Sequence, residues 1–361
     1  MESLRVLELY SGIGGMHYAL KESGIHAEVV AAIDINTTAN EIYTHNYPDT
    51  PLWNKTIEGI TLEDFNKLSF DMILMSPPCQ PFTRIGLQGD INDPRTKSFL
   101  YILDLLPRLC RLPRYILLEN VKGFETSRCQ EVMVSPTSVG IPNSRLRYFL
   151  IAKISTENLS IQSSRILDAF PHPAEQPKVL SPSADTCQPE EEVQEGHVLY
   201  KLETKTDAQR KMRPEHDLSL RLIQDFLEPQ IDMELYLLPP KTLLRYALLL
   251  DIVRPTCRRS VCFTKGYGRY VEGTGSVMQG CVETEMESVF TGLDQCAEDE
   301  KLQRLLKLKT SYFTPREVAN LMGFPQTFTF PKKTTTKQRY RVLGNSLNVV
   351  VVARLLQGLL S

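Results

Sequence analysis

The run Phe70–Met75 constrains the fold most strongly, because it is short, mainly apolar and closely followed by two prolines. Such a run has the length and bounds of a buried strand in a parallel sheet. Pro77 and Pro78 end the strand and fix a short loop. Cys79 is therefore expected at the carboxyl end of a strand, where open α/β sheets gather their ligands. A cysteine there is either a nucleophile, if a nearby charge lowers the pKa of its thiol, or a buried free thiol, and this stretch alone leaves both open.

A ligand cradle is expected near the N-terminus. Arg5–Tyr10 has a strand pattern, Ser11–Gly15 is a glycine-rich turn, and Met16–Ser23 has a helical pattern. The glycines allow a ligand to approach the backbone closely, and the helix N-terminus offers N–H groups. The spacing is Gly-x-Gly-Gly rather than the dinucleotide pattern, so an ordinary tight turn is the alternative.

The second strand, Val29–Ile33, ends at Asp34, a carboxylate placed to accept both hydroxyls of a ribose. The pairing of this residue with the glycine turn favours a nucleotide-like cofactor. A helix is expected over 36–46, and a short, less regular unit around Lys55–Glu58.

A further strand, Tyr115–Leu118, ends at Glu119, after a helix opening near Pro94. A carboxylate at the end of an apolar strand is costly to bury and is expected in a cleft, where its raised pKa would suit a general acid. An exposed strand-end glutamate is the alternative.

Two arginines, Arg145 and Arg147, precede the strand Tyr148–Ala152. They are two residues apart on extended chain and share a face. Two guanidinium groups beside a cleft can clamp an anion or polarise a carbonyl oxygen.

The second half has a different composition. Residues 171–197 are rich in proline and glutamate, as in a linker or surface excursion, and helices are expected over 218–227 and 243–253. Residues 253–270 carry a local charge of about +5 with an aromatic and glycines, which suits a nucleic-acid strand, although a solvated basic surface is equally open. Residues 331–341 are basic again. The closing apolar helix, Val349–Leu360, is expected to return to the first domain.

Composition limits the class of protein. The 361 residues predict two domains, and a formal charge of −2 gives no overall attraction to nucleic acid or membrane. The eight cysteines include no Cys-x-x-Cys, so we expect free thiols in a reducing compartment and no metal site. We expect neither a signal peptide nor a bilayer-spanning run, and thus an intracellular protein, cytoplasmic or nuclear.

Taken in order, these segments resemble the cytosine-5 methyltransferases, and the wording is similar to the eukaryotic tRNA(Asp) branch. The matching segments are Leu7–Gly15, Asp34, Pro77–Gln80, Glu119–Val121, Arg145–Arg147, Cys262–Gly268 and Gly344–Ser346. The resemblance implies an α/β fold, a Rossmann-like methyltransferase with a mixed, mostly parallel sheet and a smaller target-recognition domain. The implied domains are 1–155 with 340–361 for catalysis, a linker over 156–198, and 199–339 for target recognition.

The resemblance also implies roles. S-adenosylmethionine would be the methyl donor, and the target would be cytosine 38 in the anticodon loop of tRNA(Asp), with DNA possible in vitro and the protein a monomer away from membranes. Four residues would be catalytic: Cys79, Glu119, Arg145 and Arg147. The residues that would line the cofactor site are Ile13, Gly14, Gly15, Asp34, Ile35, Ile57, Glu58, Ser76 and Ser346. Nucleic acid would contact Arg84, Arg258, Arg259, Lys265 and Tyr267.

One departure stands out. In the family a helix follows the strand that ends at Glu119, whereas only Lys122–Glu131 is available here, and about one helix after Glu125 is absent. A lost helix would uncover apolar sheet surface worth several kcal/mol. Three functions stay open: an RNA cytosine-5 methyltransferase, a DNA cytosine-5 methyltransferase, and a catalytically impaired RNA-binding variant. A nicotinamide dehydrogenase is disfavoured, because the third fingerprint glycine is missing.

Overall fold

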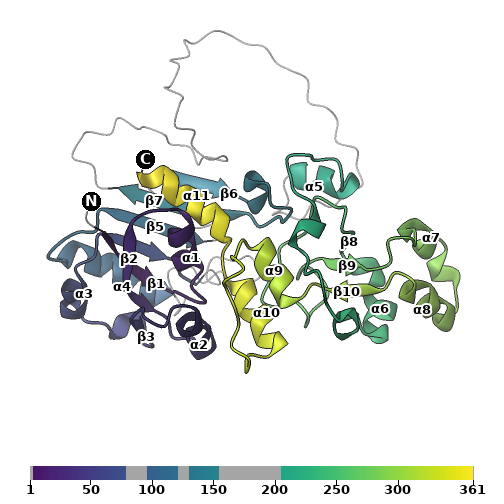
Figure 1. The fold of residues 1–361 in the computed structure, drawn as a ribbon, viewed down its shortest axis with the longest axis horizontal. Coiled ribbons are helices and arrows are strands. Elements are labelled where there is room, and N and C mark those ends of the chain that lie inside the picture. Colours follow the sequence, from purple (N-terminus) through teal and green to yellow (C-terminus); the bar gives the residue numbers. More distant parts are fainter. Residues whose placement is uncertain (1–2, 79–95, 121–129, 154–204, 361) are drawn as a thin grey trace, which may run out of the picture.

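The computed structural model describes residues 3–78, 96–120, 130–153 and 205–360. Its centre is a seven-stranded sheet in the order β3-β2-β1-β4-β5-β7-β6 (Figure 1). The strands β1 to β5 are parallel, and β7 is antiparallel to both β5 and β6, so the mixed, mostly parallel sheet is confirmed. The strands are β1 Leu4–Leu9, β2 Ala27–Ile33, β3 Leu52–Trp53, β4 Met72–Met75, β5 Tyr115–Asn120, β6 Gln130–Val134 and β7 Arg147–Lys153.

Helices cover both faces of this sheet, because its strands are apolar on both sides. One face carries side chains such as Val6 and Leu74, and it packs with α1, α2 and α11. The opposite face, including Leu7 and Ile73, packs with α3 and α4. The helices are α1 Gly15–Glu22, α2 Thr37–Asn46, α3 Leu62–Leu68, α4 Lys97–Leu105 and α11 Val349–Leu360.

The closing helix α11 lies on the first sheet and contacts α1, although more than 300 residues separate them in sequence (Figure 1). Its buried Val352 and Leu356 belong to the same core as Val6. Within the described ranges, one helical stretch, Thr336–Leu359, is long and apolar enough to cross a membrane, which run length alone had not led us to expect. In this structure the stretch is divided between α10 (Thr336–Asn345) and α11, and 61% of its most apolar window is buried in the protein.

A smaller sheet, β10-β9-β8, lies at the other end of the molecule near α6, α7 and α8, whereas α9 lies beside α10 in the middle (Figure 1). The core of that part joins Leu243 and Leu305 from two helices to Val277 of the sheet. The strands are β8 Ile252–Val253, β9 Val277–Gln279 and β10 Thr310–Tyr312. The helices are α5 Lys205–Met212, α6 Pro240–Tyr246, α7 Met286–Phe290, α8 Glu298–Leu306 and α9 Pro315–Leu321.

Two helix predictions in this part were wrong. Over 218–227 only a 3-10 turn forms, Ile223–Phe226, and over 243–253 the helix starts earlier, at Pro240, and gives way to β8. Over 218–227 the apolar spacing reflects burial of a 3-10 turn, whereas over 243–253 only the first turn is helical, with Leu243 packed against α8, and the later apolar residues belong to a 3-10 turn and β8. Pro239 and Pro240 fix the start of α6, since proline is tolerated in a first helical turn.

Candidate active site

The glycine turn between β1 and α1 is a close-approach site for a ligand. Gly12 and Gly14 have φ of +53° and +85°, a region that side chains with a Cβ disfavour. A Cβ on Gly14 would lie 3.1 Å from the Tyr47 ring, and one on Gly15 would lie 3.0 Å from Ser346 Oγ. The turn therefore brings bare backbone next to Ser346, and the buried hydroxyl of Ser11 has no hydrogen-bond partner among the residues that the structure describes.

Asp34 ties the tip of β2 to that turn. One carboxylate oxygen accepts a hydrogen bond from the Gly12 N–H at 2.8 Å, and the other accepts from the Asn36 N–H at 2.7 Å. Burial raises the pKa of Asp34, and these backbone N–H groups oppose the rise. The neighbouring Ile35 side chain is 62% exposed, so an apolar surface lies beside the carboxylate at this edge of the sheet.

The other predicted cofactor residues lie at strand ends or on nearby turns. Ser76 follows β4 and donates a hydrogen bond to the carbonyl of Tyr10, at the end of β1. Ile57 is buried and Glu58 is exposed on the 3-10 helix Ile57–Gly59, and Ile13 is buried in the core. Ile13, Ser76 and Ser346 are thus tied to the edge of the sheet that carries the glycine turn.

Glu119 lies near the end of β5, with its side chain 12% exposed and its carboxylate 3.3 Å from Arg147 Nε. Burial raises the pKa of this carboxyl, while the charges of Arg147 and Arg145 lower it. Met75, the last residue of β4, pairs with Leu118, so the chain leaves β4 beside Glu119 and runs toward Cys79. Cys79 and Arg84 lie outside the described residues, and their expected roles stay predictions.

Arg145 joins three segments of the chain. Its side chain is buried and donates hydrogen bonds to the carbonyls of Phe263, Gly344 and Ser346. A guanidinium has five N–H groups in a fixed fork, so it can satisfy several acceptors at once. Arg145 therefore anchors the Cys262 loop and the Gly344–Ser346 segment, whereas Arg147 faces Glu119.

Cys262 lies at this cluster, a contact that the sequence reading missed. Its Sγ is 3.3 Å from Arg145 Nη1 and 3.9 Å from Arg147 Nη2. Burial alone would raise the pKa of the thiol, but the two guanidinium charges outweigh burial and lower it. The sequence signal was the basic character of the Cys262 segment, but spacing could not show that its cysteine faces arginines more than 110 residues earlier.

The predicted nucleic-acid residues divide into exposed and internal side chains. Lys265 is exposed. Arg258 donates to the carbonyl of Leu220, and Arg259 holds Asp251 through two hydrogen bonds of 2.7 and 3.1 Å. Arg259 is therefore bound mainly within the protein.

The nucleic-acid role expected for Tyr267 is corrected by this structure, because the side chain is only 4% exposed. Its hydroxyl donates to the Ser276 carbonyl and accepts from the Phe313 N–H. Its ring meets Phe263, Tyr312 and Tyr340 edge-on. A ring held in this aromatic core offers no face for stacking on a base.

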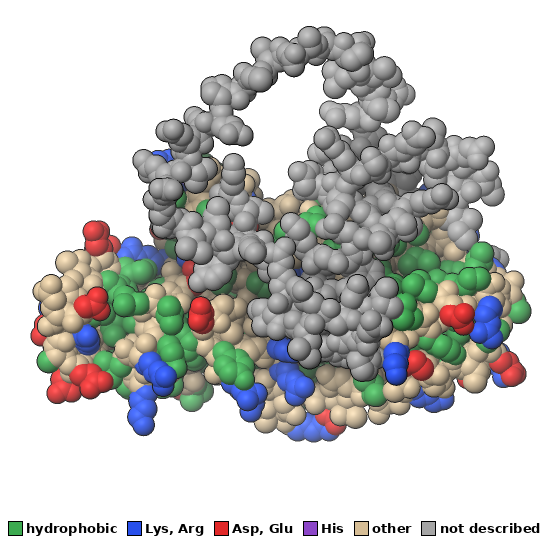
Figure 2. Space-filling view, turned by 180° about the vertical axis from the view of Figure 1, so that it is seen from behind, with side chains coloured by type: hydrophobic (Ala, Val, Ile, Leu, Met, Phe, Trp, Pro, Cys, Tyr) green, Lys and Arg blue, Asp and Glu red, His purple; other side chains and the backbone are tan. Residues whose placement is uncertain are grey.

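The basic segment after Pro331 does reach the surface. Lys332, Lys333, Lys337 and Arg341 are exposed, and Lys333 pairs with Glu41 at 3.0 Å. Figure 2 shows lysine and arginine side chains along the lower edge of the molecule, on the face seen from behind. These cations concentrate positive charge on one part of the surface of a chain whose net charge is −2.

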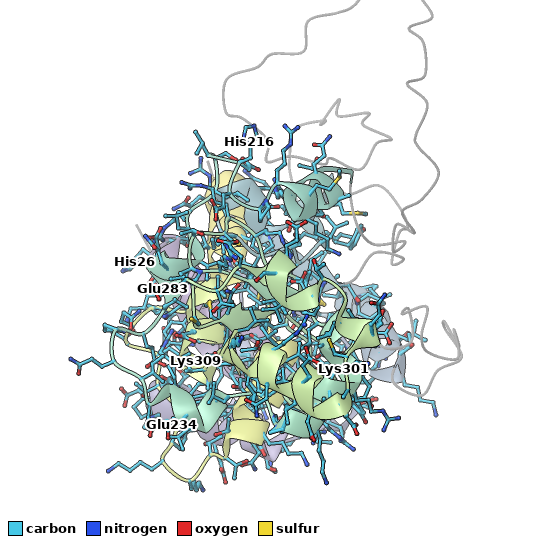
Figure 3. The ribbon with its side chains drawn as sticks, turned by 90° about the vertical axis from the view of Figure 1, so that its right-hand side faces the viewer. His26, His216, Glu234, Glu283, Lys301 and Lys309 are labelled. Carbon is cyan, nitrogen blue, oxygen red and sulfur yellow. The ribbon has the colours of Figure 1, made fainter. Side chains whose placement is uncertain are left out.

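An open pocket of about 680 Å³ lies elsewhere, against α5 and the turn that follows it. It is lined by residues such as Gln209, Arg213 and His216, and His216 lies at the upper edge of the molecule in Figure 3. None of the predicted catalytic or cofactor residues that the structure describes lines it. These residues gather at the strand ends instead.

Comparison with known proteins agrees with this geometry. A family model described as "C-5 cytosine-specific DNA methylase" matches residues 4–135 and 128–361. The chain belongs to the cytosine-5 methyltransferase family. The two matched ranges overlap at 128–135, a stretch that includes β6 and directly follows the short connection after β5.

The methyltransferase has full-length relatives. A Homo sapiens protein named "tRNA (cytosine(38)-C(5))-methyltransferase" is 57% identical over 391 aligned positions, covering 99% of both chains. A Spodoptera frugiperda protein of the same name is 40% identical over 372 positions, covering 98% of both. A Dictyostelium discoideum protein named "DNA (cytosine-5)-methyltransferase" is 37% identical, covering 100% of this chain and 95% of the relative.

Solved structures show the same fold. A crystal structure of a mutant of Spodoptera frugiperda DNMT2 superposes with a TM-score of 0.76 at 36% identity, covering 99% of this chain and 100% of the other. The structure of the S. pombe Dnmt2 methyltransferase gives 0.73 at 35% identity, covering 99% and 98%. The expected Rossmann-like methyltransferase fold is therefore confirmed.

Proposed function

We propose that this methyltransferase transfers a methyl group to C5 of cytosine 38 in the anticodon loop of tRNA(Asp). The observation that carries the proposal is the Glu119–Arg147 pair at the end of β5, beside the start of the segment that holds Cys79. Support also comes from relatives named for cytosine 38 of tRNA that are 57% and 40% identical over almost the whole chain.

The cofactor implied by the family is S-adenosylmethionine, and the residues at the glycine turn fit it. The bare backbone of Gly14 and Gly15 leaves space close to the chain, and the orphaned Ser11 hydroxyl can serve a polar ligand group. Asp34 and Ile35 offer a carboxylate for ribose hydroxyls and an apolar surface for a base. When bound, this group supplies an electrophilic methyl on a sulfonium.

Activation of the cytosine would begin at Cys79. Its thiolate adds to C6 and forms an S–C6 bond, while the Glu119 carboxyl gives a proton to N3, so that electron density is placed on C5. The raised pKa of Glu119 favours the protonated, donating form. After methylation of C5, loss of the C5 proton to a water base, cleavage of the S–C6 bond and return of the N3 proton to Glu119 restore the ring, the thiolate and the acid.

Arg147 positions the acid in this scheme. Its guanidinium holds the Glu119 carboxyl at 3.3 Å and would also meet the base oxygen. Arg145 would act through its contacts to Phe263, Gly344 and Ser346. The target base must leave its stack to reach such a site, which costs less in a loop than in a duplex.

The short connection after β5 is compatible with the sheet. Gln130 and Leu117 both pair with Ile151 of β7, so β6 begins level with a residue only three positions before the end of β5. The chain must return about 10 Å and cross two strand spacings, also about 10 Å. Ten Cα steps can span about 33 Å, so the shortened connection permits β6 to pair as observed.

A methyl-transfer assay tests the proposal. Purified protein and methyl donor are incubated with a tRNA(Asp) transcript, with a transcript carrying uridine at position 38, and with duplex DNA, and bisulfite sequencing locates the product. We expect methylation at cytosine 38 only and none with a C79A control. Methylation of duplex DNA at a higher rate would support the DNA enzyme, and RNA binding without methylation would support the impaired variant.

A further inference from the structure

A buried carboxyl group lies beneath the glycine turn and has no part in the chemistry above. Glu8, the residue before the last of β1, is 0% exposed and is flanked in the sheet by Ala32 and Leu74. Its Oε2 accepts a hydrogen bond of 2.7 Å from the Tyr43 hydroxyl of α2. Within the described residues its Oε1 makes no hydrogen bond of ordinary geometry, although the backbone N–H of His17 at the start of α1 faces the carboxyl.

A chain of hydrogen bonds extends from this carboxyl to α1. The Tyr43 hydroxyl is also 2.8 Å from Nδ1 of His17, whose ring stacks on Tyr47 at a centroid distance of 3.6 Å. Glu8 thus connects β1 to both helices that frame the turn. Two arrangements of protons keep all three groups neutral: His17 donates to Tyr43 and Tyr43 donates to Glu8, or a protonated Glu8 donates to Tyr43 and Tyr43 donates to His17.

The same aromatic residues form the packing behind Gly14. A Cβ on Gly14 would lie 3.1 Å from the Tyr47 ring and 3.3 Å from the Tyr43 ring. A shift of either ring would therefore reach the turn backbone directly. Because the turn also meets Ser346 through Gly15, the disturbance would extend to the proposed cofactor site.

We propose that Glu8 is a positioning residue of the cofactor site, whose neutral carboxyl holds Tyr43 and the glycine turn in the binding geometry. This inference rests on the proposed cofactor site. A neutral carboxyl matches its surroundings, which within the described residues offer the Tyr43 hydroxyl and the His17 backbone N–H but no cation. The titratable groups that face it are Tyr43 and Tyr47 from α2 and the residue after it, His17 from α1, and Asp34 from the end of β2.

Electrostatics agree with the neutral form. Burial raises the pKa of Glu8 to about 8, and the charge of Asp34 adds to this rise. The hydrogen bonds from Tyr43 and from the His17 backbone lower the pKa, but by less. Burial lowers the pKa of His17 to about 4, so this ring is also uncharged at neutral pH. Ionisation of Glu8 would place an anion in the core that only the Tyr43 hydroxyl and the His17 N–H could stabilise, and the network would have to rearrange.

The consequence is a pH dependence of ligand affinity. If only the neutral form is competent, the apparent Kd rises as the competent fraction falls, by about tenfold at pH 9 for a pKa of about 8, and by little at pH 7. An E8Q variant, which is neutral at every pH and can still accept from Tyr43, should bind with a constant affinity. Any titration of the ligand itself affects the Kd of the wild type and of E8Q equally. The ratio of the two Kd values at each pH therefore reports the ionisation of Glu8 alone.

The test is calorimetric binding of S-adenosylhomocysteine between pH 6.5 and 9, with wild type, E8Q, E8L and E317Q. Glu317 is the matched control: it is also buried with a pKa raised by burial to about 7, but it caps α9. We expect the wild type and E317Q to lose about tenfold in affinity from pH 7 to 9, and E8Q to change less than twofold. E8L, which removes the hydrogen bond that ties Tyr43 to β1, should bind at least tenfold more weakly at pH 7, while circular dichroism shows it folded.

Each alternative outcome has a distinct meaning. Equal pH slopes for wild type and E8Q, or normal binding by E8L, would overturn the role of Glu8. Failure of the wild type to bind at any pH would instead overturn the proposed cofactor site. If E8L does not fold, the comparison of E8Q with wild type still decides the question.

Discussion

Arg145 offers a sharp test, because its contacts differ from those of Arg147 only two residues away. In R145M the carbonyls of Phe263, Gly344 and Ser346 would lose their donor inside the protein. Each buried acceptor left unsatisfied costs about 1–3 kcal/mol. Part of this cost is offset, because the variant no longer has to bury the charged guanidinium. We expect a net loss of about 3–5 kcal/mol, a large share of the stability of an ordinary domain.

The matched variant is R147M. Arg147 is 20% exposed and its ion pair is with Glu119, whose carboxyl can take up a proton when the guanidinium is removed. R147M should therefore lose about 1 kcal/mol or less in stability. Its rate of methyl transfer should fall at least 100-fold, since Arg147 orients the catalytic acid Glu119. Urea unfolding followed by circular dichroism, together with single-turnover methylation of tRNA(Asp), measures both quantities.

The two variants should also differ in cofactor binding. Because Arg145 holds the backbone of Ser346, R145M should weaken S-adenosylhomocysteine binding, whereas R147M should not. An R145M protein with the wild-type urea midpoint and wild-type ligand affinity, yet no methyl transfer, would refute the anchoring role. Such a result would return Arg145 to the base-contacting role expected from the sequence.

Four further predictions follow from the site. D34N should weaken S-adenosylhomocysteine binding about tenfold by calorimetry, and unchanged affinity would remove Asp34 from the cofactor site. E119Q should lower the single-turnover rate about 10²–10⁴-fold with ligand affinity retained, and a rate within tenfold of wild type would contradict the acid role. K265A should reduce the slope of log Kd for tRNA against log salt by about 0.7, whereas R259A should lower the urea midpoint and leave that slope unchanged; the reverse pattern would reassign both. Because the pKa of Glu8 is raised above its usual 4.5 to about 8, unfolding free energy should fall by about 1.4 kcal/mol per pH unit from pH 5 to 7.5 in wild type relative to E8Q, and parallel curves would show that Glu8 ionises normally.

The sequence was informative where one local signal fixed the structure. Apolar runs that end in Asp34, Glu119 or the Pro77–Pro78 pair predicted parallel strands with functional groups at one edge, and the sheet has this arrangement. The glycine turn was predictable because positive φ at Gly12 and Gly14 favours glycine.

What the sequence did not show depends on distant contacts. Arg145 and Arg147 share a strand face by spacing, yet one reaches Phe263 and Ser346 while the other reaches Glu119. Tyr267 stands among basic residues but fills an aromatic core, since local charge does not report tertiary burial. The helix predicted over 218–227 is a 3-10 turn, and the one predicted over 243–253 ends at Tyr246, because apolar spacing reports burial without fixing the backbone conformation.

The most direct measurement of the proposed mechanism is a covalent trap. A tRNA(Asp) carrying 5-fluorocytidine at position 38 is incubated with enzyme and methyl donor, and the products are separated under denaturing conditions and analysed by mass spectrometry. Because fluorine at C5 blocks the final elimination, the account predicts an RNA–protein adduct at Cys79 that is absent from C79A and strongly reduced in E119Q. Methylated tRNA formed from the natural substrate without any adduct in the trap, or an adduct at another cysteine, would contradict it.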